Sequence, residues 1–63
     1  MTPDALRAAL VALHWTQRGL AAILGINERQ VRRWAAGRPI PPLIACWLAE
    51  VADWHIQHPP PRK

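Results

Sequence analysis

Two short amphipathic segments lie only three residues apart in this chain, on either side of Gly25, Ile26 and Asn27. Residues 17–24 and residues 28–36 each carry apolar side chains at the three- and four-residue spacing of an α-helix. A connection this short does not let two helices lie antiparallel in full contact. It favours a steep crossing about a tight turn. The sequence therefore predicts a pair of crossed helices at its centre.

Local signals indicate where these two helices begin and end. Thr16 and Asn27 have the side chains preferred at a helix N-cap. Gln30, three residues after Asn27, completes a capping box. Gly25 and Gly37 suit the left-handed residue that follows a helix. The two helices should therefore be short and sharply bounded.

Two further segments read as helices on either side of this pair. Thr2 and Pro3 form a helix start, and Pro41-Pro42 can open another, since proline is tolerated in a first helical turn. We expect an all-α, four-helix compact domain over residues 1–57, with helices at about 3–14, 17–24, 28–36 and 41–57. The proline-rich tail, 58–63, cannot continue a helix, and we expect it to be disordered.

Positive charge is concentrated in the central part of the chain. Residues 16–38 hold five arginines against one glutamate, a local net charge of +4, which equals the formal charge of the whole chain. Residues 39–57 hold only Glu50 and Asp53 as charged residues. A basic bias of this kind attracts polyanions. One half of the molecule therefore suits phosphate groups, and the other does not.

Several function classes find no support in the sequence. No window of about 18 residues is apolar and uncharged, and the first residues lack the basic start of a signal peptide, so we expect a cytoplasmic protein with no membrane partner. The histidines and the single cysteine, Cys46, match neither a zinc spacing nor an activated nucleophile. We therefore expect no metal, no cofactor and no catalysis. Without a disulfide, so short a chain depends on helix packing or on a second copy.

The second helix of the central pair presents a polar, largely basic face. With Val31 and Trp34 turned inward, the outward residues are Glu28, Arg29, Arg32, Arg33 and Ala36, and Gln30 lies nearer the edge of this face. In the major groove of DNA, arginine bonds guanine bidentately and glutamate can accept from cytosine. We expect bases to be read by Glu28, Arg29, Gln30, Arg32 and Arg33. An ion pair between Glu28 and Arg32, four residues apart, is an equally supported role for the glutamate.

The stretch 16–37 resembles the Cro/repressor-type helix-turn-helix family. The resemblance is carried by Thr16-Gln17, Leu20-Ala21, Leu24-Gly25-Ile26-Asn27, Val31, Trp34 and Gly37. It implies a shortened lambda-repressor-like DNA-binding fold and a transcriptional regulator. Gly19 departs from the family pattern, which commonly has an acidic or long polar residue there.

The resemblance also implies roles for individual residues. Glu28, Arg29, Gln30 and Arg33 match the base-reading positions of the family. Thr16, Gln17 and Arg38 match positions that contact the DNA backbone, and Arg18 adds a further charge beside them.

The last helical segment, 41–57, has an apolar surface wider than one stripe. This surface either completes the small core or joins two copies of the chain, and we favour a two-fold interface. The expected interface residues are Ile44, Trp47, Leu48, Val51 and Trp54.

Together these features predict a sequence-specific DNA-binding transcriptional regulator of a bacterium, phage or mobile element. We expect a repressor that binds double-stranded DNA at an inverted-repeat operator as a homodimer, with helix 28–36 in the major groove. The alternative is a protein-interaction module or antitoxin-like protein, in which the apolar surface of 41–57 binds a second protein partner.

Overall fold

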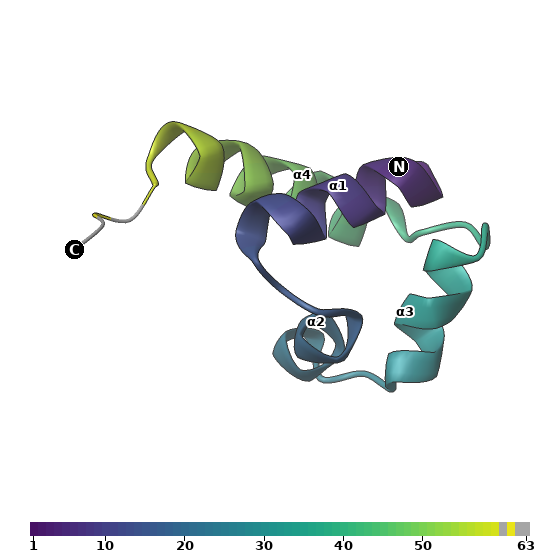
Figure 1. Ribbon diagram of the computed structural model, residues 1–63. Coiled ribbons are helices and arrows are strands. Elements are labelled where there is room, and N and C mark those ends of the chain that lie inside the picture. The colour runs from purple at the N-terminus through teal and green to yellow at the C-terminus, as the bar shows by residue number, and fades with distance from the viewer. Residues whose placement is uncertain (60, 62–63) are drawn as a thin grey trace.

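The computed structural model describes residues 1–59 and residue 61, and this part of the chain folds into four helices without a strand (Figure 1). The helices are α1 (Pro3–Leu13), α2 (Gln17–Leu24), α3 (Glu28–Ala35) and α4 (Pro42–Gln57). The predicted all-α fold is confirmed. Each observed helix begins and ends within one residue of its expected bounds.

The N-caps of the central helices form as the sequence predicts, with one difference in detail. The Thr16 hydroxyl oxygen accepts a hydrogen bond from the backbone N–H of Gly19 at 2.9 Å. The Asn27 side-chain oxygen accepts from the N–H of Arg29 at 2.9 Å, one residue before the Gln30 N–H that a capping box would use. The prediction of a capping box at Asn27 is therefore wrong, because the short asparagine side chain bonds the N–H two residues ahead and closes a tighter turn.

Left-handed residues end the first two helices. Gly25 follows α2 with a φ of 70°, and the next N–H, that of Ile26, donates to the carbonyl of Ala21 at 3.0 Å. His14 ends α1 in the same conformation, with a φ of 59°. Residues other than glycine rarely adopt the left-handed conformation, so the sequence does not mark His14 as the residue that ends the helix. The predicted helix, 3–14, is therefore one residue too long.

One fully buried side chain from each helix forms the centre of the core. These side chains are Leu6, Leu20, Val31 and Leu48. Leu48 was expected at an interface between copies, and that expectation is wrong, because its side chain is enclosed by the chain's own helices. The helical period places Leu48 on the inner edge of the wide apolar surface of α4.

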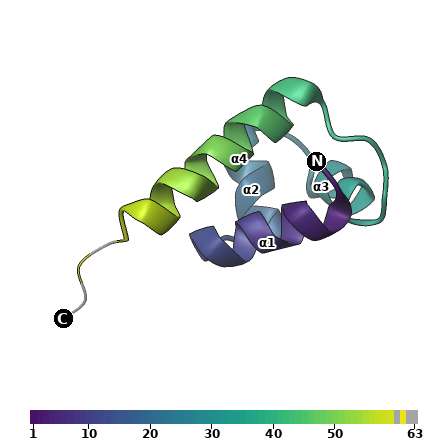
Figure 2. The ribbon, with the colours of Figure 1, turned by 90° about the horizontal axis from the view of Figure 1, so that it is seen from above.

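The helices form two layers around this core. α1 and α4 pack side by side (Figure 2), whereas α2 and α3 cross on the opposite side of the core (Figure 1). α2 packs mainly against α3, which also contacts α1. No helix in the described ranges is long and apolar enough to cross a membrane. The central pair is therefore held on a platform made by the first and last helices.

The apolar surface of α4 is divided between the core and solvent. Ile44, Trp47 and Val51 are partly buried against the core. Trp54 is 62% exposed, and Leu43 is 87% exposed. One edge of α4 therefore completes the core, and the other edge remains uncovered by the protomer.

The segment after α4 begins with an ordered contact. The His58 N–H donates to the carbonyl of Trp54 at 2.9 Å, and the two aromatic rings stack with centroids 4.6 Å apart. The expected disordered tail, 58–63, falls in part on residues 60 and 62–63, which lie outside the described residues. His58 itself is held against the end of α4.

Candidate nucleic-acid interface

α3 has one buried apolar face and one exposed polar face. Val31, Trp34 and Ala35 are buried in the core. The side chains on the opposite face are exposed, and they are Arg29, Gln30, Arg32 and Arg33. The apolar face anchors the helix, so the polar row has a fixed direction outward from the body of the protein.

Glu28 and Arg32 form an ion pair on this outer face. The Arg32 Nη2 and Glu28 Oε1 atoms lie 3.2 Å apart, and the two side chains are 62% and 34% exposed. A pair at this spacing on a helix contributes roughly 0.2–0.5 kcal/mol, so it opens easily when a ligand competes. In the described part of the chain Arg29 and Arg33 form no ion pair. These two guanidinium groups carry the available positive charge of α3.

The start of α2 brings three polar side chains together. Thr16 caps the helix, Gln17 is its first residue and is half-buried, and Arg18 is exposed. The Thr16 oxygen accepts from the Gly19 N–H, which leaves the hydroxyl hydrogen free to donate to another group. The positive end of a helix dipole favours an anion at such a position.

The departure at Gly19 has a local structural reason. A Cβ built on Gly19 would meet the capping oxygen of Thr16 at 3.1 Å, tighter than ordinary van der Waals contact. The glycine therefore leaves room for the cap of α2. No sequence signal points to this contact.

The turn after α3 returns the chain toward the helix that it leaves. Gly37 has a φ of 116°, which a side chain rarely tolerates, and the Arg38 N–H donates to the carbonyl of Arg33 at 2.9 Å. Arg38 therefore lies beside the last turn of α3 with its side chain exposed. The sequence predicts the turn from Gly37, but not the position to which it brings Arg38.

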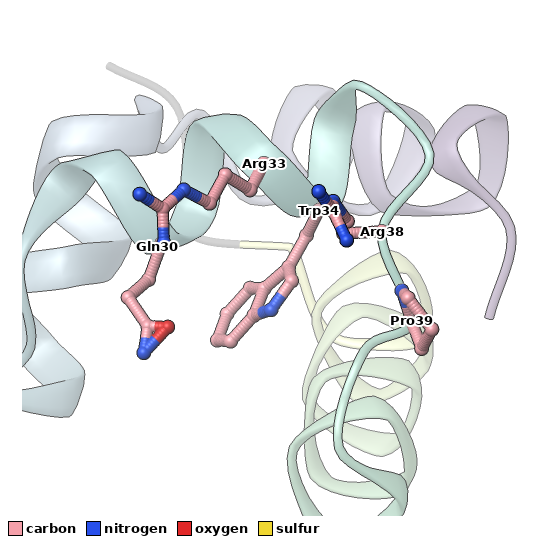
Figure 3. A pocket seen from close by; sticks show the side chains of 5 residues that line it. All are labelled: Gln30, Arg33, Trp34, Arg38 and Pro39. Atoms are coloured by element: carbon pink, nitrogen blue, oxygen red, sulfur yellow. The ribbon is translucent and has the colours of Figure 1, made fainter.

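A hollow of about 600 Å³ lies between α3 and this turn (Figure 3). It is lined by Gln30, Arg33, Trp34, Arg38 and Pro39. The indole ring of Trp34 lies between the Gln30 amide on one side and Arg38 and Pro39 on the other. Trp34 and Pro39 were not among the expected site residues, because their sequence signals are those of a core position and a helix stop.

Arg7 of α1 is a supporting residue that the sequence does not reveal. Its Nη2 atom donates to the carbonyl of Ala35 at the end of α3, at 2.9 Å, across 28 residues of chain. The last carbonyls of a helix lack partners within the helix, so this bond satisfies one of them. Arg7 thereby joins α1 to the end of the helix that carries the polar row.

The candidate DNA-binding residues lie at the start of α2, on α3 and on the turn after α3, and these three segments meet on the α2–α3 side of the molecule (Figure 1). The residues expected at an interface between copies lie on a different element, α4.

Comparison with family models matches residues 6–52 to the helix-turn-helix model, a range that includes all of α2 and α3 and most of α1 and α4. No curated protein and no solved structure gives a significant match. The matched range contains the crossed helices, the short turn between them and the outward polar row. The chain belongs to the Cro/repressor-type helix-turn-helix family of DNA-binding regulators.

Proposed function

We propose that this DNA-binding regulator is a sequence-specific repressor that inserts α3 into the major groove of its operator. The observation that carries this proposal is the exposed row on α3, opposite a face that is locked into the core. The major groove is about 12 Å wide and admits one helix. A row with a fixed direction can present the same donors to every copy of an operator.

The base-reading role is proposed for the polar row and for Glu28. Arg29 and Arg33 are the best placed to bond guanine, because neither forms an ion pair in the described part of the chain. Gln30 offers an amide to adenine. Arg32 and Glu28 reach bases only when their ion pair opens, which costs little at this exposure.

The phosphate-contacting role is proposed for two places that flank α3. Thr16, Gln17 and Arg18 stand at the start of α2, and Arg38 stands on the turn after α3. Contacts to the backbone on both sides of the recognition helix would set its register in the groove without reading sequence.

The active form is proposed to be a homodimer on an inverted repeat, in the cytoplasm of a bacterial cell. Ile44, Trp47 and Val51 keep part of their surface exposed, and Trp54 is 62% exposed, so α4 offers apolar area to a second copy. A two-fold axis between copies would set the two α3 helices about 34–36 Å apart, one turn of DNA.

Selection of bound duplexes from a random pool tests this proposal. The expected result is a consensus with two half-sites related by two-fold symmetry. Selection without any consensus would contradict sequence-specific binding. A consensus with a single half-site would retain the reading role of α3 and contradict the homodimer.

A second candidate function is supported by one observation, the uncovered apolar area of α4. Leu43 is 87% exposed and Ile56 is 64% exposed, on different flanks of the helix. An antitoxin-like protein would bind a partner protein there. A salt titration separates the two candidates, because binding through several phosphates weakens steeply with salt, whereas an apolar contact hardly responds.

A further inference from the structure

The hollow beside α3 holds a hydrogen-bond donor that the protein itself does not use. Trp34 is only 5% exposed, and its indole Nε1–H donates to no acceptor within the described residues. In the same part of the chain no buried polar side-chain atom is left without a partner. The indole N–H therefore reaches the surface, and Trp34 meets that surface in the hollow (Figure 3).

The groups around this donor select for an anion. Arg33 and Arg38 line the hollow, together with the Gln30 amide, and none of the described residues that line it carries a carboxylate. The Gly37 turn fixes Arg38 at its place, since the Arg38 N–H bonds the Arg33 carbonyl. Each guanidinium group offers several N–H donors to an anion.

The lining of the hollow is not only polar. The ring of Trp34 and the ring of Pro39 add apolar surface beside the polar groups. A ligand that combines an anionic group with a small apolar ring matches this lining. A phosphate with its attached deoxyribose has both parts.

We infer that the hollow receives one phosphate of the DNA backbone together with its sugar. The Trp34 indole N–H and the Arg38 guanidinium donate to the phosphate oxygens, and the Trp34 and Pro39 rings contact the sugar. This inference rests on the proposed function and deepens it, because it makes Trp34 a direct DNA contact in addition to a core residue.

The position of the hollow favours a duplex over a free anion. Gln30 and Arg33 belong both to the hollow and to the polar row of α3. A duplex whose major groove receives α3 has a sugar-phosphate strand along each side of the helix. One strand therefore passes the hollow when the row meets the bases.

The experiment uses duplexes in which one phosphate at a time is replaced by a neutral methylphosphonate. At one position in each half-site, the replacement should weaken the wild-type chain by about tenfold or more, since a hydrogen bond to a charged group contributes about 1.5–3 kcal/mol. Trp34→Phe, which removes the N–H and keeps a ring, should bind the native duplex more weakly and lose most of that sensitivity. Trp15→Phe, at a tryptophan that packs against the core and does not line the hollow, is the matched control and should retain it.

Two further measurements keep the test decisive if Trp34→Phe folds poorly. Arg38→Gln should lose sensitivity at the same phosphate. In the wild-type chain, the four tryptophans give four indole N–H signals by NMR, and that of Trp34 should move and become protected from exchange when the duplex binds.

The outcomes separate this inference from the function on which it rests. Specific binding with an unmoved Trp34 signal and no phosphate coupled to Trp34 or Arg38 would overturn the inference alone. A shift of that signal with inorganic phosphate but not with the duplex would overturn its assignment to the DNA backbone. Failure of the wild-type chain to bind any duplex would overturn the proposed function as well.

Discussion

The indole rings of Trp15 and Trp47 stack with their centroids 6.2 Å apart and their planes inclined by 29°. This contact joins the connection between α1 and α2 to the middle of α4. Aromatic pairs contribute about 0.5–1.5 kcal/mol beyond their buried area. We predict a coupling free energy of unfolding in this range from a double-mutant cycle of Trp15→Leu and Trp47→Leu, measured by urea denaturation.

The pair of Trp15→Leu and Trp54→Leu is the control for this cycle. Trp54 stacks on His58 rather than on Trp15, so these two substitutions should be additive. Equal coupling in both cycles would contradict a specific Trp15–Trp47 contact.

The ion pair between Glu28 and Arg32 yields a second prediction. Glu28→Gln should lower the free energy of unfolding by no more than roughly 0.2–0.5 kcal/mol, because both side chains are partly exposed. It should also change the preferred base at one position if Glu28 reads DNA. Thermal unfolding and site selection with the same variant measure the two effects. An unchanged consensus would mean that Glu28 forms the ion pair with Arg32 and does not read bases.

The sequence predicts local features of this fold better than contacts between distant segments. The caps at Thr16 and Asn27 and the turn at Gly25 depend on side chains that act within a few residues, and all three are observed. Leu48 was placed wrongly because helical spacing alone does not decide whether an apolar residue faces the chain's own core or a second copy.

The candidate DNA-binding site could be predicted from the sequence to a similar extent as the fold. The direction of the α3 row follows from Val31 and Trp34, which are local signals. The hollow and the Arg7 bond depend on how the α3–α4 turn and α1 lie against α3. Such distances between elements are set by the whole core, and no spacing in the sequence encodes them directly.

The bond from Arg7 to the Ala35 carbonyl gives a third prediction. Arg7→Met keeps the aliphatic stem but removes the donor, so the free energy of unfolding should fall by about 1 kcal/mol. Arg18→Met, an exposed arginine of α2, is the control and should be close to neutral. Urea denaturation of both variants provides the measurement. Equal effects of the two substitutions would argue against a structural role for the Arg7 bond.

Arg33 provides a fourth prediction, on base preference. Arg33→Ala should cost about 1–3 kcal/mol of binding free energy and relax the preference at one base position of each half-site. Arg18→Ala, which removes a charge beside the start of α2, should weaken all sequences without changing the consensus. Site selection with both variants makes the comparison. A consensus that keeps its stringency at every position in Arg33→Ala would contradict base reading by this residue.

Gln17 tests the other class of contact, because its half-buried side chain at the first position of α2 is proposed to hold a backbone phosphate. Gln17→Ala should weaken binding to every duplex alike, by about 1 kcal/mol, and leave the consensus unchanged. Gln57→Ala is the matched control, since the Gln57 amide bonds Asp53 within α4 at 3.0 Å, and its DNA affinity should equal that of the unaltered chain. Titration against a specific and an unrelated duplex measures the ratio of the two affinities. A change in that ratio for Gln17→Ala would mean that the residue takes part in reading sequence, because a phosphate contact alone acts equally on all duplexes.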